Sequence, residues 1–256
     1  MEVRIAAVSD TGIKKKINQD AILVKVASSF WGRIVLAAVC DGMGGLNEGE
    51  LASATMVHEL EEWFTNVLLS TLEKENRAEV IKDSLIQMIL NTDERLKKYT
   101  ERSGKKIGTT VSVLLVIDCE YYIVNVGDTR VYLHNGEKML QKTKDHTYVQ
   151  QEIDAGRMTE KQAAQSPNRS VLLQCVGASA RPNPDFWRDK IHSPTVFLIC
   201  SDGFRHVLQE NEIEKVMKFE KLGTERQMQK TLRKLVETIK ERKEEDNISA
   251  IILKIF

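Results

Sequence analysis

Four aspartates stand where short apolar segments begin or end, and this pattern most constrains how the chain can fold. Asp41 directly follows the apolar segment 34–40, and Asp202 follows the segment 195–200 after a single serine. A carboxylate at a strand end lies at the rim of a sheet on rigid backbone, so such residues can converge although they are far apart in sequence. Hard divalent cations prefer oxygen ligands of this kind. The four candidates are Asp20, Asp41, Asp202 and Asp246.

A simpler interpretation of these aspartates is a set of turns. Asp41 and Asp202 are each followed by glycine, and an Asp-Gly pair between apolar segments is more often a hairpin turn than a metal site. Repetition of the pattern favours the metal site. The chain also has no Cys-x-x-Cys, no His-Glu-x-x-His, no Gly-x-x-x-x-Gly-Lys-Ser/Thr and no EF-hand spacing around the aspartates. The aspartates are therefore the candidate functional residues that these sequence patterns indicate.

Composition limits the classes of protein that fit. The chain has 256 residues, of which 42% are hydrophobic and 29% charged, which is typical of globular proteins and favours a single domain over 1–256. Lys+Arg and Asp+Glu both number 37, so overall charge gives no argument for nucleic-acid binding. We expect a monomer.

The cysteines and the amino-terminal segment suggest a compartment. The 4 cysteines are widely spaced, which favours small buried side chains in a reducing environment. The start of the chain lacks a basic region followed by a long apolar stretch, and no apolar run approaches the roughly 18 residues of a membrane-spanning helix. These features predict a soluble, cytoplasmic protein without membrane attachment.

Hydrophobic patterns predict an α+β fold. Strands are expected at 3–8, 21–26, 34–40, 111–117, 121–126, 131–133, 138–141, 196–200 and 248–255. Asn47 with Glu50 resembles a helix-capping pair, and long amphipathic helices are expected after it, around 81–96 and around 228–239. Two short helices, near 148–155 and 160–165, fall in a weakly patterned segment, about 144–181, that we expect to form a surface flap. Strand groups separated by helix pairs favour antiparallel sheets packed together and covered by helices.

Several motifs, taken in order, extend over nearly the whole chain. They are Asp41-Gly42-Met43-Gly44-Gly45, Gly108-Thr109-Thr110, Gly127-Asp128-Thr129-Arg130, Asp145-His146, Ser201-Asp202-Gly203 and Asp246-Asn247. Each motif is weak alone, but the ordered set resembles the metal-dependent type 2C Ser/Thr protein phosphatases, and its bacterial branch in particular.

The resemblance implies a four-layer αββα sandwich with two Mn²⁺ or Mg²⁺ ions at one end of two central, mainly antiparallel sheets. It implies that Asp41 bridges both ions, that the Gly42 carbonyl joins the coordination, and that Asp20, Asp202 and Asp246 supply the other protein ligands. A hydroxide between the ions would attack phosphorus in a phosphoserine or phosphothreonine. The implied substrates are phosphorylated Ser/Thr proteins, and a cognate Ser/Thr kinase would be the opposing enzyme.

Two positions depart from the family pattern at points that bear on phosphate binding and proton transfer. An arginine usually binds the substrate phosphate, and Lys15 aligns with it here; lysine keeps the charge but loses the bidentate fork. A run of three lysines is otherwise simply a solvated charge cluster. Many relatives have histidine, a proposed general acid, where this chain has Met43. His146 is a candidate substitute, although a histidine in a turn is more often structural.

A third metal site is the other open question. The resemblance implies that Asp128 and Asp202 hold a third, weaker ion together with an aspartate that this chain replaces by His206. Either His206 ligates the ion through a ring nitrogen or the third site is absent. Asp128 is alternatively a turn residue between two strands.

Two rival functions remain at this stage. One is a catalytically impaired regulatory or binding module with the same fold, which the four retained aspartates disfavour. The other is a small-molecule phosphomonoesterase that uses the same centre. The flap would determine the substrate, and its sequence does not distinguish proteins from small molecules. The backbone amides of Gly44 and Gly45 and the helix start after Asn47 are candidates for a secondary role in phosphate binding, or serve only to turn the chain.

Overall fold

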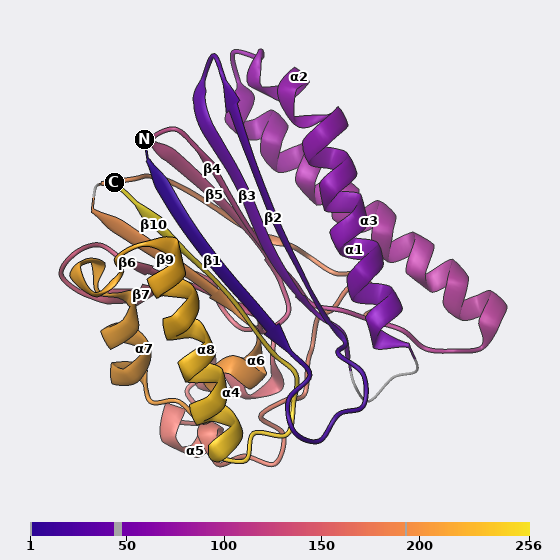
Figure 1. The fold of residues 1–256 in the computed structure, drawn as a ribbon. Helices are drawn as coiled ribbons and strands as arrows, with labels where there is room; N and C mark the ends of the chain where they lie inside the picture. Colours follow the sequence, from indigo (N-terminus) through magenta and orange to yellow (C-terminus); the bar gives the residue numbers. More distant parts are fainter. Residues whose placement is uncertain (1, 44–47, 193) are drawn as a thin grey trace.

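Two antiparallel sheets form the centre of the molecule (Figure 1). The computed structural model describes residues 2–43, 48–192 and 194–256. One sheet has the order β1-β10-β9-β6-β7, with bounds Val3–Asp10, Ile248–Ile255, Thr195–Cys200, Arg130–His134 and Met139–Gln141. The other has the order β2-β3-β4-β5-β8, with bounds Asp20–Ser29, Gly32–Asp41, Val111–Ile117, Glu120–Val126 and Asp185–Lys190.

Helices cover the outer face of each sheet, which completes four layers (Figure 1). The β2–β3–β4–β5–β8 sheet is covered by α1 (Gly49–Asn66), α2 (Leu68–Leu72) and α3 (Arg77–Ser103). The other sheet is covered by α7 (Glu210–Met217) and α8 (Glu225–Glu241), with the 3₁₀ turn η1 (Phe219–Lys221) between them. The short helices α4 (Tyr148–Asp154), α5 (Glu160–Ala164) and α6 (Asp202–Arg205) lie at one end. The predicted αββα sandwich is confirmed.

The continuous apolar runs of the sequence are explained by burial on both faces of the sheets. In β9, Val196 and Leu198 pack toward the outer helices, whereas Phe197 and Ile199 pack between the two sheets. Successive side chains of a strand point to opposite faces, so a strand covered on both sides has no polar alternation. The core is therefore three apolar layers, one between the sheets and one under each set of helices.

The late helix shows how local sequence sets an element. Thr224 accepts from the backbone N–H of Gln227, whose side chain accepts from the Thr224 N–H, so α8 begins with a capping box. Its buried side chains recur at helical spacing, and they are Met228, Leu232, Val236 and Ile239. The expected capping residue of α1, Asn47, lies outside the described residues.

All nine expected strands are present, with bounds shifted by a few residues at most. Strand β8 and the helices α2, α6 and α7 were not predicted. Among the described strands, β8 is an edge strand that pairs with β5 alone and consists of half-buried and exposed residues, so its charged residues hide the strand pattern. α7 has eight residues and two buried side chains, Ile213 and Met217, which is too short to show a helical period.

One end of the sandwich gathers the polar strand ends. Asp20, at the start of β2, pairs in register with Asp41, at the end of β3. In the neighbouring sheet, Arg130 at the start of β6 is opposite Cys200 at the end of β9. This end lies away from both chain termini (Figure 1). None of the described helices combines the length and the apolar character needed to span a membrane.

Candidate metal centre

The four aspartates predicted from the sequence lie at this end, two from each sheet. Asp20 and Asp41 come from β2 and β3. Asp202 is the first residue of α6, directly after β9, and Asp246 lies two residues before β10. Asp20 and Asp202 are buried, and the other two are half-buried.

The glycines of the two Asp-Gly motifs permit close backbone contacts. A Cβ on Gly42 would lie 2.4 Å from the carbonyl oxygens of both Gln19 and Gly49, and a Cβ on Gly203 would lie 2.1 Å from the carbonyl oxygen of Asn247. No side chain fits at such distances, so glycine is required at both positions. These contacts join the chain after β3 to the start of α1, and α6 to the start of β10.

A motif before β4 fixes the backbone of Asp41. The Asp41 N–H donates to Thr110 Oγ1 at 3.0 Å, and the Asp41 carbonyl accepts from the Thr110 N–H at 2.9 Å and from Thr109 Oγ1 at 3.0 Å. Threonine at both positions of the Gly108-Thr109-Thr110 motif therefore holds the end of β3 in place.

The carboxylates of this end are buried or half-buried, have few hydrogen-bond donors and repel one another. Neither side-chain oxygen of Asp20 has a hydrogen-bond partner among the described residues, and the same holds for Oδ1 of Asp202. Burial, together with repulsion from Asp202, raises the pKa of Asp20 to about 7. Burial and the neighbouring Asp20 likewise raise the pKa of Asp41 well above its usual range. Buried acceptors without donors are costly, and divalent cations would relieve both the missing contacts and the repulsion.

The residues present fit hard divalent ions, with one adjustment. In the part of the chain that the structure describes, no three acidic, His or Cys side chains are already arranged to hold an ion, so the carboxylate side chains would have to rearrange on binding. The donor set is oxygen-rich, which suits Mg²⁺ and Mn²⁺ rather than Zn²⁺. Cys40 precedes the last residue of β3 and Cys200 ends β9; both are fully buried, and burial raises the pKa of both thiols, which disfavours thiolate ligation.

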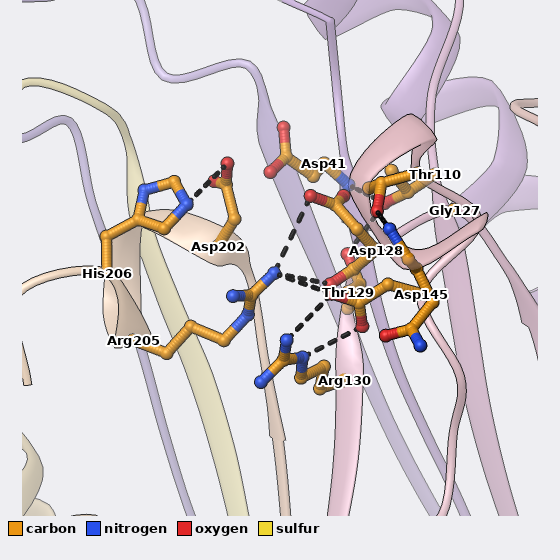
Figure 2. A network of polar contacts seen from close by, with 12 residues as sticks. Asp41, Thr110, Gly127, Asp128, Thr129, Arg130, Asp145, Asp202, Arg205 and His206 are labelled. Carbon is orange, nitrogen blue, oxygen red and sulfur yellow. Dashed lines mark hydrogen bonds and ion pairs between the residues drawn. The ribbon is translucent and has the colours of Figure 1, made fainter. Parts of the chain in front are cut away.

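A buried ionic network lies beside the aspartates (Figure 2). Arg130 donates to both oxygens of Asp145, at 2.8 Å each. The Nη2 atom of Arg205 lies 3.4 Å from Asp145 Oδ2 and 3.6 Å from Asp128 Oδ2, and it donates to the Asp128 carbonyl oxygen at 3.1 Å. Burial and the charge of Asp202 raise the pKa of Asp128 to about 7, although Arg205 opposes the shift. Asp128 is therefore held by the network and not only by a turn.

His206 has a different set of neighbours. Its Nε2 lies 3.5 Å from Asp202 Oδ2, and its Nδ1 lies 3.8 Å from Glu244 Oε2. In Figure 2, His206 and Asp128 appear on opposite sides of Asp202. Within the described residues, His206 thus contacts Asp202 and Glu244 and not Asp128.

Lys15 lies at the candidate centre. Its Nζ is 3.0 Å from Asp246 Oδ1. The loop that carries Lys15 is fastened by the buried Asn247, whose amide group donates to the carbonyls of Thr11 (2.9 Å) and Ile17 (3.3 Å). Asn247 Oδ1 also accepts from the backbone N–H of Gln19 at 2.9 Å. The Asp246-Asn247 motif therefore combines a candidate ligand with a residue that positions the lysine loop.

His146 is engaged at both ring nitrogens. Its Nδ1 accepts from the Gly127 N–H at 3.2 Å, and its Nε2 lies 3.0 Å from Asp185 Oδ2. The side chain is only 8% exposed. These contacts favour a structural role that ties the β5–β6 turn to β8, and its use as a general acid stays a prediction. Gly44, Gly45 and Asn47 lie outside the described residues.

Sequence reasoning missed Arg205 and Glu244. Arg205 follows the Ser-Asp-Gly motif by two residues, and Glu244 precedes Asp246 by two. The position of Arg205, just after a buried strand and the Ser-Asp-Gly motif, indicates that its charge is paired. No sequence spacing indicates that Asp128 and Asp145 are the partners.

A cavity of about 540 Å³ borders the network. From the segment between β7 and β8 it is lined by Thr147, Val149 and Ile153, and from α6, α7 and their connection by Arg205, His206 and Ile213. Arg205 and His206, which contact Asp128 and Asp202, thus also line the cavity.

Comparisons with known proteins agree with this fold. The family model described as protein phosphatase 2C matches residues 13–251. Protein phosphatase PhpP of Streptococcus pneumoniae is 26% identical over 216 residues, which is 84% of each chain. The structure of the serine/threonine phosphatase Stp1 from Staphylococcus aureus superimposes with a TM-score of 0.86 at 26% identity, covering 100% of this chain and 96% of that one.

A third comparison concerns the fold alone. The catalytic domain of the serine threonine protein phosphatase PstP, solved in complex with 2 manganese ions, has a TM-score of 0.77 at 22% identity and covers 98% of this chain and 97% of its own. The fold is that of the metal-dependent protein phosphatases. The chain belongs to the protein phosphatase 2C family, whose model spans nearly all of it.

Proposed function

We propose that the chain is a metal-dependent phosphoprotein phosphatase that hydrolyses phosphoserine and phosphothreonine. The observation that carries the proposal is that both carboxylate oxygens of Asp20 and one of Asp202 are buried without a hydrogen-bond partner among the described residues, at the same end as Asp41 and Asp246. Two Mn²⁺ or Mg²⁺ ions bound there would supply a hydroxide nucleophile at neutral pH. Asp20, Asp41, Asp202, Asp246 and the Gly42 carbonyl would hold them.

The chain's own residues orient the substrate phosphate. The side chain of Lys15 is 30% exposed and its ammonium already lies beside Asp246, so it can reach a phosphate held at the centre. Asn247 fixes the loop that carries it. A single ammonium binds phosphate as a point charge, without the fork of an arginine.

Replacing Lys15 with alanine is expected to lower kcat/KM for a phosphothreonine peptide by about 10–100-fold, since a charged hydrogen bond contributes about 1.5–3 kcal/mol. Steady-state kinetics measures the effect, which should fall mainly on KM. Lys14→Ala is the matched control, because Lys14 pairs with exposed Glu245. Equal losses in both variants would mean that the lysines act only through general charge.

Substrate choice would be determined beside the centre. The flap of residues 144–181 contributes one wall of the cavity that Arg205 and His206 border, so a phosphoprotein segment could contact it while its phosphate lies at the ions. We propose that the substrates are proteins phosphorylated on Ser or Thr and that a Ser/Thr kinase is the opposing enzyme. We also propose that the phosphatase is a cytoplasmic monomer with a single domain over 1–256.

The first test is hydrolysis of a phosphothreonine peptide with EDTA, Mg²⁺ and Mn²⁺ compared side by side. Activity is expected only with a divalent ion. Sugar and nucleotide phosphates serve as competing substrates, and their preferred hydrolysis would point to a small-molecule phosphomonoesterase. No turnover under any metal would instead support a binding module.

A further inference from the structure

Asp128 already has a fixed positive partner. Its side chain is 7% exposed, and the Arg205 guanidinium lies 3.6 Å from its Oδ2. The same Arg205 nitrogen donates to the Asp128 backbone carbonyl at 3.1 Å. One cationic group therefore contacts both the main chain and the carboxylate of this residue.

Arg205 is itself held in position. Its side chain is 12% exposed, and Nη2 lies 3.4 Å from Asp145 Oδ2. Asp145 in turn accepts two hydrogen bonds from Arg130, and Arg130 donates to the hydroxyl of Tyr132 at 3.0 Å. A guanidinium cannot be deprotonated in a protein, so the positive charge beside Asp128 is permanent.

A metal ion at Asp128 does not fit this arrangement. An ion there would lie within a few ångströms of the Arg205 charge, in a buried region where charges are poorly screened. His206, which stands where the family pattern has an acidic residue, contacts Asp202 and Glu244 instead. Among the described residues, His206 therefore does not join Asp128 as a ligand of a third ion. The negative charge of Asp128 is already neutralised by Arg205.

We infer that Arg205 takes the place of a third metal ion at Asp128, so that the chain binds two ions and supplies the remaining cation itself. The inference rests on the proposed two-ion centre. Arg205 is a positioning residue: it holds Asp128 and, through Asp145, the start of β6 beside the ions.

The test counts Mn²⁺ ions bound per chain, using the electron paramagnetic resonance signal of free Mn²⁺ during titration. The wild type is expected to bind two, and Asp128→Asn is expected to leave that number unchanged because Asp128 is committed to Arg205. Arg205→Gln should bind one more, and that additional ion should be lost in the double variant with Asp128→Asn. Arg205→Lys, which keeps the charge, should return the count to two.

Arg242→Gln is the control, since it removes an exposed arginine that pairs with Glu212 and should not change the count. A third wild-type ion that Asp128→Asn removes would overturn the inference and leave the proposed function standing. A folded Arg205→Gln that gains no ion would also overturn it. A wild type that binds no Mn²⁺ would overturn both. If Arg205→Gln fails to fold, the counts for the wild type, Arg205→Lys and Asp128→Asn decide.

Discussion

Asp41→Asn is expected to lower kcat for a phosphothreonine peptide by about a thousandfold or more, with the fold retained. The substitution keeps the size of the side chain but removes the charge that would bridge the two ions. Ions at such centres supply several kcal/mol of transition-state stabilisation, and each 1.36 kcal/mol corresponds to a factor of ten in rate. Steady-state kinetics with saturating Mn²⁺ measures the loss.

The control for this variant is Asp83→Asn, an exposed aspartate on α3, which should keep wild-type activity. Circular dichroism should show unchanged secondary structure in both variants. In EDTA, Asp41→Asn should be at least as stable as the wild type, because it removes one of the mutually repelling carboxylates. Activity close to wild type in Asp41→Asn would contradict the assignment of Asp41 as a bridging ligand.

The metal-free protein is expected to become more stable as pH falls from about 8 to about 5.5. Burial raises the pKa of Asp20 and of Asp128 to about 7, whereas an unfolded aspartate titrates near 3.9. Between these values the folded chain binds more protons than the unfolded chain, so stability falls as pH rises and the loss is complete above about pH 7. Each unit of pKa difference is worth roughly 1.4 kcal/mol.

Thermal unfolding in EDTA at several pH values measures this effect. A change of 1 kcal/mol shifts the midpoint by about 2–4 °C in a chain of this size, so a rise of several degrees on acidification is expected. With Mn²⁺ present the midpoint near pH 8 should rise, because ions replace the missing protons. A midpoint in EDTA that increases between pH 5.5 and pH 8 would contradict the raised pKa values.

Much of the fold and the core of the candidate site could be predicted from sequence because both depend on local patterns. A strand buried on both faces is a continuous apolar run, and the aspartate at its end is visible in the sequence. Asp41 and Asp202 show this directly. Asp20 pairs with Asp41 in the register of β2 and β3, so the two aspartates lie at the same end of one sheet.

The parts that could not be predicted depend on contacts between distant segments. Arg205 meets Asp128 across 77 residues of sequence, and both nitrogens of His146 are occupied by groups from other elements. Neither relation leaves a spacing in the sequence. Strand β8 and helix α7 were missed for the related reason that the one is a polar edge strand and the other is very short.

The division of the four aspartates between two sheets has a mechanical consequence. Asp20 and Asp41 belong to one sheet, while Asp202 and Asp246 flank strands of the other. Ions bound by all four would act as a cross-link between the two halves of the sandwich, at the end opposite both termini. Each half would contribute two of the four aspartates. Metal affinity would thus report on how firmly the two sheets are docked, and any substitution that loosens the apolar layer between them should weaken ion binding even far from the carboxylates.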